Sequence, residues 1–312
     1  MQSLWMLFAS FVFAFMGVCV KLASQYYSTS ELVMYRGLIG VIFLAVLVRM
    51  RGGTLKTTLP WPHLKRGVIG VTSLWMWFFA LGALPLASAM TLNYTSSIWM
   101  AAMLLVAGWW QGTKRTEWGL IAAIVTSFVG VALLLHPSFN SNQWFSGLVA
   151  LCSGIVSAIA YLQVRDLGRL GEPEYRVVFY FSATGAVTGL LTGFYHDGSF
   201  GMPALHAHTL RGFTLLATIG VTAAIAQMAM TRAYHLGKTL VTANLQYTGI
   251  VFSSIWGMII WSDMLGWQSW TGIALILASG MAATYYNVQT TRAAVEANIE
   301  ADPIVAEISE IA

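Results

Sequence analysis

The chain has 312 residues, of which only 9% are charged and 57% are hydrophobic, and its mean hydropathy is +0.70. A soluble domain carries roughly 25% charged residues because its surface must meet water, so this composition excludes a soluble protein and predicts a membrane protein. The net charge of +4 does not indicate a nucleic-acid partner, because the basic residues lie in short loops between long apolar runs rather than in one patch or arm.

Ten runs along the chain are long and apolar enough to cross a membrane, which takes about 20 residues for a hydrocarbon core of roughly 30 Å. They cover residues 4–24, 31–50, 67–85, 88–110, 117–135, 144–164, 175–195, 211–233, 239–261 and 267–287. No basic residue precedes the first run, as it would in a signal peptide, so we expect a helix of the mature protein there. Gly185, Gly189 and Gly193 recur on one face of the seventh run, where a neighbouring helix can approach closely. The predicted fold class is an all-α polytopic membrane protein with ten transmembrane helices.

The basic residues of the connections are distributed unevenly between the two sides of the membrane. If the N-terminus is cytoplasmic, thirteen of them, Arg66 included, lie in inner connections or in the tail, whereas only Lys21 and Arg211 lie near outer connections. This positive-inside bias predicts that both termini are cytoplasmic. Residues 288–312 carry five of the twelve acidic residues, and we expect a solvated extension there.

One polar phrase occurs once in each half of the chain. LNYT at 92–95 returns as LQYT at 245–248, and the same shift of 153 residues aligns Gly119 with Gly272. Each half then contains five runs, so the second half enters the membrane from the opposite side and the repeats are inverted. Inverted repeats around a midplane site are typical of alternating-access transporters. The expected division is two inverted five-helix repeats and a tail, with boundaries at 1–140, 141–287 and 288–312.

These features resemble the drug/metabolite transporter (DMT) superfamily, and specifically its EamA-type ten-helix metabolite exporters. The resemblance rests on the five-plus-five pattern, on Arg36 in ELVMYRGLIG, on the short turn in ALPLASAMTLNYT, and on the segment that begins TANLQYTGIVFSSIWGMIIW. It covers residues 1–287 and implies a metabolite transporter of the bacterial inner membrane. Asp263 departs from the pattern, because many relatives have Glu at the end of the ninth run.

The repeated phrase places an amide and a phenol inside two runs of opposite direction. From their positions we expect Asn93 and Tyr94 near the outer mouth, and Gln246 and Tyr247 near the inner mouth. Buried polar groups cost free energy in hydrocarbon unless they are partnered or wet. Two interpretations stay open. The four residues are gates that exchange partners as the halves rock, or they join helices by hydrogen bonds worth about 0.6 kcal/mol each.

Other polar and aromatic side chains within the runs are candidates for lining a substrate cavity. Their depth gives as candidates Trp75, Trp77, Trp99, Tyr161, Gln163, Tyr180, Gln227, Asn244 and Trp256. From these we select Trp75, Trp99, Tyr161, Tyr180, Gln227 and Asn244. For the tryptophans the alternatives are lipid contact and core packing.

Arg36 is the only charge that the sequence places well within a run. Since arginine keeps its proton, it needs an anion, carbonyl groups or water. It either binds a substrate carboxylate or phosphate, or it snorkels outward or pairs with Glu31. The resemblance favours the second interpretation, because the family commonly has Arg here whatever the substrate.

Acids, histidines and cysteines give no sign of catalysis or of a metal. The seven acids before the tail and the six histidines all lie at run ends or in loops, so the membrane-embedded carboxylate of small multidrug cation antiporters is missing. Cys19 and Cys152 lie in apolar runs without metal-ligand spacing. The sequence has neither an H-E-x-x-H nor a G-x-S-x-G motif, so we predict that the protein is not an enzyme and has no cofactor.

The predicted function is alternating-access export of a small polar metabolite, such as an amino acid or a related organic anion or zwitterion. Arg36 and the amide and aromatic residues indicate a polar solute, whereas the expectation that this solute is an amino acid comes only from the family resemblance. One alternative is a sugar or nucleotide-sugar carrier, although a nucleoside diphosphate needs more than one buried cation. Another is a receptor or structural membrane protein.

The expected partners are the solute and the lipid bilayer. Five runs per half can enclose a site within one chain, so we expect a monomer or weak homodimer.

Overall fold

The computed structural model describes residues 2–84, 86–110, 118–135, 143–196, 199–200, 205–262, 266–268, 270–279, 281–282 and 285. Its elements are η1 (Gln2–Leu4), α1 (Trp5–Ala23), α2 (Thr29–Met50), α3 (Pro60–Ala83), α4 (Leu86–Tyr94), α5 (Ser96–Trp110), α6 (Trp118–Leu135), α7 (Trp144–Arg169), α8 (Glu174–Gly193), β1 (Tyr195–His196), β2 (Ser199–Phe200), α9 (Leu210–Leu236), α10 (Thr239–Leu245) and α11 (Thr248–Trp261). A further apolar helix covers Trp270–Ser279.

Each of the ten predicted runs contains helix. Among the described residues, five helices are long and apolar enough to cross a membrane, and they cover Gln2–Ala23, Thr29–Met50, Pro60–Ala83, Trp144–Arg169 and Leu210–Leu236. The predicted start of the third run at residue 67 is wrong, because α3 begins at Pro60 and takes Arg66 into the helix. Proline is well suited to the first helical positions, where its missing N–H has no intrahelical partner to lose. The all-α expectation also missed the short antiparallel pair β1–β2 between α8 and α9.

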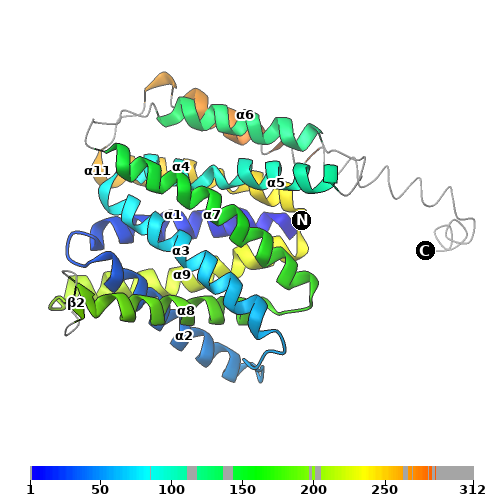
Figure 1. Cartoon of the computed structure of the whole chain (residues 1–312). Helices are drawn as coiled ribbons and strands as arrows, with labels where there is room; N and C mark the ends of the chain where they lie inside the picture. Colours follow the sequence, from blue (N-terminus) through cyan, green and yellow to red (C-terminus); the bar gives the residue numbers. More distant parts are fainter. Residues whose placement is uncertain are drawn as a thin grey trace, which may run out of the picture.

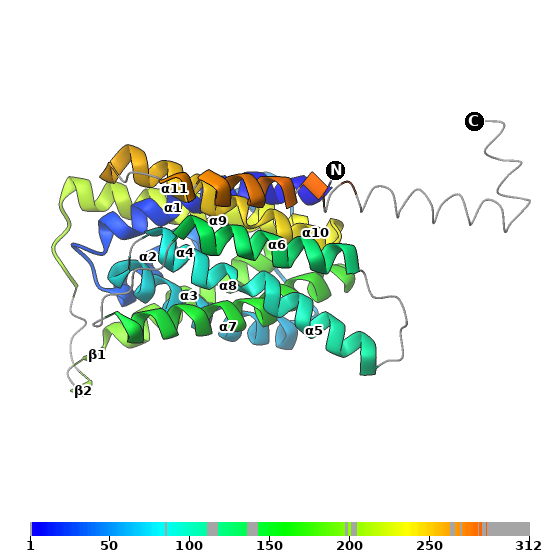
Figure 2. The same ribbon diagram turned by 90° about the horizontal axis from the view of Figure 1, so that it is seen from above.

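The long helices lie side by side in one bundle (Figures 1 and 2). α1 packs on α9 as α7 packs on α3, and α2 packs on α9 as α8 packs on α3. α2 and α8 pack on each other. The helix contacts therefore keep the same pattern when the first and second halves of the chain exchange places. α6 lies at the edge of the bundle in Figure 1, and its Gly130 packs against the backbone of Gly272.

The outward faces of the helices carry large apolar side chains. Met50, Phe213 and Ile259 are 81%, 60% and 66% exposed, and they belong to three different helices. Soluble monomers rarely expose extended apolar surface. The bundle therefore has a surface suited to lipid.

The predicted close approach on the glycine face of α8 is confirmed at Gly189. A Cβ there would lie 2.6 Å from the Met34 backbone nitrogen on α2, whereas a Cβ on Gly185 would lie 3.8 Å from Val71, an ordinary contact. Backbone atoms cannot turn away, so we expect Gly189→Ala to lower stability by about 1–3 kcal/mol. Gly185→Ala is the matched control and should be tolerated. Melting temperatures of the detergent-purified variants test this, and equal values for both would contradict the close approach.

Candidate functional site

The repeated phrase of the sequence marks a break in two helices. α4 ends at Tyr94 and α5 begins at Ser96, while α10 ends at Leu245 and α11 begins at Thr248. The Thr95 hydroxyl donates to the Leu92 carbonyl at 2.7 Å, and in the second copy the Thr248 hydroxyl donates to the Leu245 carbonyl at the same distance. A hydroxyl can satisfy a carbonyl that loses its helical partner. The phrase therefore gives the two breaks the same hydroxyl–carbonyl contact.

The two breaks meet inside the bundle. The Gln246 side-chain amide lies 3.5 Å from the Ser96 hydroxyl, and the Ser97 hydroxyl donates to the Ala243 carbonyl at 2.6 Å. A Cβ on Gly249 would lie 2.7 Å from the Tyr94 hydroxyl, so a larger residue at this position would displace the Tyr94 side chain. The prediction that the two copies lie near opposite mouths is wrong. It counted helical turns from the run ends, and the breaks instead bring the copies together.

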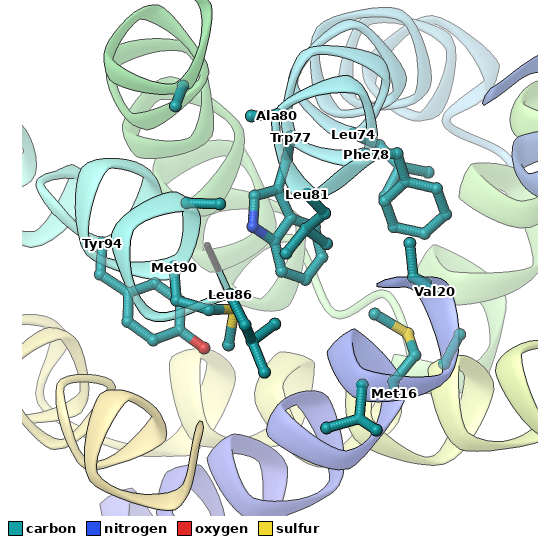
Figure 3. Packing of buried hydrophobic residues seen from close by; sticks show 14 of the residues in the cluster. Met16, Val20, Leu74, Trp77, Phe78, Ala80, Leu81, Leu86, Met90 and Tyr94 are labelled. Carbon is teal, nitrogen blue, oxygen red and sulfur yellow. The ribbon is translucent and has the colours of Figure 1, made fainter. Parts of the chain in front are cut away.

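A cavity of about 60 Å³ lies beside the breaks. Side chains from α1, α2, α3, α4, α7, α8 and α9 and from the α10–α11 break line it, so both halves of the chain contribute to its wall. Trp77 and Tyr94 form part of that wall and stand among the apolar Leu81, Leu86 and Met90 (Figure 3). The volume is large enough for a few water molecules.

Two arginines face this cavity. Arg36 of α2 and Arg66 of α3 are 3% and 2% exposed, and their guanidinium carbons lie 5.0 and 4.4 Å from the centre of the Phe181 ring. The Arg36 Nε, the Arg66 Nε and the Arg66 Nη1 have no hydrogen-bond partner. The predicted alternative, in which Arg36 snorkels or pairs with Glu31, is wrong because Arg36 is buried and the Glu31 carboxylate binds other groups. Arg66, which the sequence placed in a loop, is a second charge within the bundle.

Amides and hydroxyls form the other polar side of the cavity. Asn93 donates to the Ser153 hydroxyl at 2.8 Å, and the Ser73 hydroxyl lies beside that of Ser157. Near the second break, the Tyr234 hydroxyl donates to the Gln246 amide oxygen at 3.2 Å. These groups both donate and accept hydrogen bonds, so they can orient a polar solute.

A buried carboxylate ties two loops together at the end of the bundle where α2 begins. Glu31 accepts hydrogen bonds from the Ser28 backbone at 2.8 Å, from the Ser28 hydroxyl at 2.9 Å and from the His206 backbone at 2.7 Å, and the His206 Nδ1 lies 2.7 Å from the carboxylate. Ser28 is the N-cap of α2 and precedes it directly, while His206 lies in the segment before α9. We call Ser28, Glu31 and His206 the Glu31 clasp.

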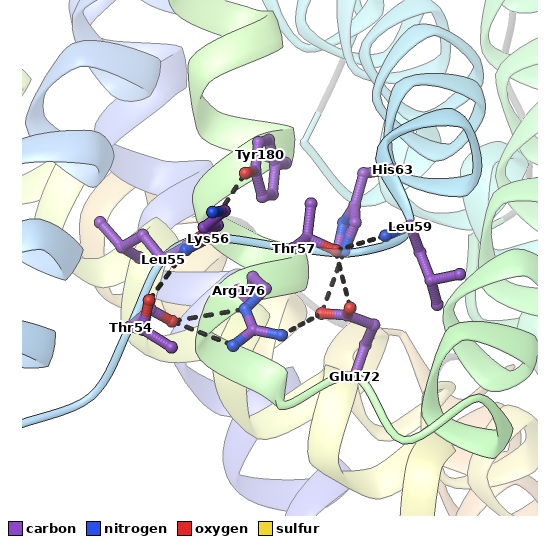
Figure 4. A network of polar contacts seen from close by, with 9 residues as sticks. All are labelled: Thr54, Leu55, Lys56, Thr57, Leu59, His63, Glu172, Arg176 and Tyr180. Atoms are coloured by element: carbon purple, nitrogen blue, oxygen red, sulfur yellow. Dashed lines mark hydrogen bonds and ion pairs between the residues drawn. The ribbon is translucent and has the colours of Figure 1, made fainter.

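A second buried carboxylate ties the loops at the other end of α2 (Figure 4). Glu172 accepts hydrogen bonds from the Thr57 hydroxyl at 2.7 Å and from Arg176 at 2.9 Å, and the His63 Nε2 lies 3.2 Å away. Arg176 also donates to the Thr54 carbonyl at 3.1 Å. We call Thr57, His63, Glu172 and Arg176 the Glu172 clasp. Each end of the bundle thus has a carboxylate that joins a loop of one half of the chain to a loop of the other.

Comparisons with known proteins identify the family. The profile of the EamA-like transporter family matches residues 1–136. The pseudopaline exporter CntI of Pseudomonas aeruginosa is 30% identical over 276 residues, which cover 88% of this chain and 92% of that protein. The chain belongs to the EamA-like transporter family. A riboflavin transporter of Rhizobium johnstonii is 25% identical to this EamA-like chain over 284 residues, 89% of each protein.

The family assignment confirms the resemblance seen in the sequence, within the DMT superfamily. A crystal structure of 18% sequence identity matches the EamA-like chain with a TM-score of 0.74 over 91% of this chain and 98% of its own, which supports the fold alone. The protein is therefore an integral membrane transporter with a small-molecule substrate, and the names of the family and its relatives indicate transport rather than catalysis. Among the described residues, no three His, Cys, Asp or Glu side chains are placed to hold a metal ion.

The cavity of this EamA-like transporter contains six of the eleven residues that the sequence selected for the site, namely Arg36, Asn93, Tyr94, Tyr161, Gln227 and Gln246. It also contains residues that the sequence did not select, above all Arg66, Trp77, Ser73, Ser157 and Phe181. Two signals could have found some of them. The prolines at the start of α3 extend that helix to include Arg66, and Ser153 and Ser157 are four residues apart on one helical face.

Five selected residues lie outside the cavity wall, and their contacts give the reason. Trp99 is 38% exposed and Trp75 only partly buried, while Tyr247 is fully buried in the apolar core. Tyr180 donates to the Leu55 carbonyl beside the Glu172 clasp. The Asn244 amide is used between helices, where it accepts from Ser127 and donates to the Ser279 carbonyl. Asp263 lies outside the described residues.

The Glu172 clasp gives stability a dependence on pH. Burial raises the pKa of this carboxyl, but the hydrogen bonds from Thr57, Arg176 and His63 outweigh burial and leave the pKa below its usual 4.5. A depressed pKa means that the clasp stabilises the fold above about pH 4.5 and that this contribution is lost as the pH falls through the lower folded-state pKa. We expect the melting temperature of Glu172→Gln to fall less on acidification than the melting temperature of the unmodified protein. Identical pH profiles of melting temperature would contradict this role.

Proposed function

We propose that this EamA-like transporter exports small polar metabolites by alternating access around the central cavity. The protein would consist of two inverted five-helix repeats, 1–140 and 141–287, with a cytoplasmic tail at 288–312 and both termini inside. The solute would contact Arg36, Tyr161 and Gln227, and the two breaks, through Asn93, Tyr94 and Gln246, would act as the gate. A monomer encloses this site, although a weak homodimer is compatible with it.

One observation carries the proposal: the cavity lies where the two broken helices meet, and both halves of the chain line it. Discontinuous helices at the interface of two inverted repeats form the binding sites of many secondary transporters. The exchange symmetry of the helix contacts supports the same architecture, since α1–α9 corresponds to α7–α3 and α2–α9 to α8–α3.

The two clasps support alternating access. Glu31 lies at the start of the second helix of its half and Glu172 just before the second helix of the other half, and each meets a histidine near the third helix of the opposite half. Both clasps are closed in this conformation. Opening the Glu172 clasp would admit solute from the cytoplasm, and opening the Glu31 clasp would release it on the other side.

The relatives support a metabolite as cargo, because they are named as exporters or transporters of pseudopaline and riboflavin. An amino acid or related organic anion fits a cavity with guanidinium, amide and hydroxyl groups. A nucleotide-sugar carrier is the second candidate. The objection that only one buried cation is present no longer holds, because Arg66 joins Arg36 in the cavity wall.

Purified protein in liposomes loaded with a mixed metabolite pool tests transport, with mass spectrometry of the released solutes. Ser73→Leu, which fills the cavity, should abolish release. The neighbouring Thr72→Leu is the matched control, because Thr72 is exposed on the outer face of α3 and should leave release unchanged. Failure of the unmodified protein to move any solute, in either orientation, would favour a receptor or structural membrane protein instead.

A further inference from the structure

The cavity wall lacks hydrogen-bond acceptors for its buried donors. The unpaired buried polar atoms of its described residues are the Arg36 Nε, the Arg66 Nε and Nη1, and the Trp77 Nε1. All four are N–H donors. No aspartate or glutamate is among the described residues that line the cavity. The missing group is therefore an acceptor.

The positive charge of the cavity wall also indicates that an anionic acceptor is missing. Arg36 and Arg66 keep their protons and lie on the same aromatic ring, that of Phe181, within 5.0 and 4.4 Å of its centre. A cation over an aromatic ring gains about 0.5–2 kcal/mol, which is less than the several kcal/mol needed to take a charged group out of water. Two like charges held close together in the bundle also repel each other. An anion between them would relieve both costs.

The buried carboxylates at the two ends of α2 already bind other groups. The Glu31 carboxylate binds Ser28 and His206, and the Glu172 carboxylate binds Thr57 and Arg176 at the other end of α2. Neither belongs to the residues that line the cavity. Within the part of the chain that the structure describes, no carboxylate therefore reaches the two guanidinium groups.

Gly70 shows that space for one guanidinium is built into the helix. A Cβ at this position would overlap the Arg66 Nη1 and would lie 2.9 Å from the Arg66 guanidinium carbon and 3.0 Å from a ring carbon of Phe181. Any larger residue would displace the Arg66 head group from its place beside the ring. The position of Arg66 in the cavity thus depends on a glycine one helical turn later.

From these observations we infer that the transported solute is a dianion whose negative oxygens bind Arg36 and Arg66 together, either two carboxylates or one phosphate group. The inference rests on the proposed function, since it names the substrate class of the same cavity. Guanidinium groups bind both oxyanions through paired N–H donors, and Trp77 offers one further donor. The Gln227 and Gln246 amides then face the remainder of the solute.

Thermal unfolding of the purified, full-length protein tests binding directly, with succinate and glycerol phosphate as dianions and succinamate as the matched monoanion. We expect the dianions to raise the melting temperature at concentrations where succinamate does not. Arg36→Gln and Arg66→Gln should each weaken dianion binding by roughly tenfold to a hundredfold. Gly70→Ala should do the same with both arginines still present, whereas Arg49→Gln, on α2 but outside the cavity wall, should bind as the unmodified protein does.

Efflux from liposomes, measured on the same variants, separates this inference from the proposed function. Release of neutral or monoanionic solutes alone, unchanged in Arg66→Gln, would overturn the dianion and leave transport standing. A dianion-specific shift that needs both arginines, without any efflux, would support the binding site and overturn transport. Absence of both would overturn both. Removal of an unpaired buried charge does not by itself destabilise a fold, so loss of binding in the glutamine variants reports on the site. A larger shift with glycerol phosphate than with succinate would identify the phosphate group as the ligand.

Discussion

Replacing Gln227 by glutamate is expected to raise the melting temperature and to lower efflux of anionic solutes at least tenfold. The substitution keeps the shape of the side chain and places a carboxylate in the wall of the cavity that also holds Arg36 and Arg66. Hydrogen bonds to charged groups contribute about 1.5–3 kcal/mol, so the internal carboxylate would stabilise the fold. It would also occupy the guanidinium groups and compete with the solute, which should lower efflux at least tenfold, since each 1.4 kcal/mol is a factor of ten.

The control for this experiment introduces the same charge elsewhere in the bundle. Gln163 lies on α7 and does not line the cavity, and its side-chain oxygen is buried without a partner. Gln163→Glu should therefore lower the melting temperature, because a buried carboxylate without a cation is unfavourable. Stabilisation by Gln163→Glu, or efflux at the normal rate in Gln227→Glu, would contradict a cavity that lacks an anion.

The sequence predicts the helices well because hydropathy and length decide them. The phrase LNYT/LQYT also points to residues that lie beside the cavity, since its polar residues stand out in apolar runs. What hydropathy cannot show is that the phrase interrupts a helix. At each break a threonine, Thr95 or Thr248, donates to the carbonyl three residues earlier, and threonine makes such bonds in many unbroken helices too.

The errors at individual site residues have two physical causes. Arg66 was assigned to a loop because hydropathy falls where charges begin, whereas the structure buries its guanidinium group over the Phe181 ring. Trp75 was chosen instead of Trp77 because depth was estimated without rotation about the helix axis. Positions two apart in an α-helix differ by about 200° around that axis, so only one of this pair can face the cavity.

The two clasps could not be predicted from the sequence, for a different reason. Histidines and acids at run ends are ordinary surface groups by composition, and nothing in the chain pairs Glu31 with His206 or Glu172 with His63. Their burial, at 2% exposure for Glu31 and 5% for Glu172, follows from the packing of α2 on α8 and α9. Three-dimensional proximity, rather than local pattern, makes them candidates for control of access.

Opening either clasp is expected to expose the cavity to one side of the membrane, and the two sides should be opposite. The measurement uses Ser157→Cys in the cavity wall, in a background without Cys19 and Cys152, with a membrane-impermeant thiol reagent applied to vesicles of each orientation. Glu172→Gln should raise the labelling rate from the cytoplasmic side and Glu31→Gln from the other side. Loss of the charge-assisted bonds costs about 1.5–3 kcal/mol, which corresponds to roughly a tenfold or greater shift in an opening equilibrium.

The matched control is Asp166→Asn, which removes an exposed ion pair with Arg165 rather than a buried clasp. Surface pairs of this kind contribute only about 0–1 kcal/mol, so labelling from both sides should stay near the rate of the unmodified protein. If Glu31→Gln and Glu172→Gln both raise labelling from the same side, the clasps are not a mirrored pair of gates. If the double variant labels from both sides, the two clasps act independently, and the coupling that prevents a continuous leak must then come from the helix breaks, where Gln246 meets Ser96.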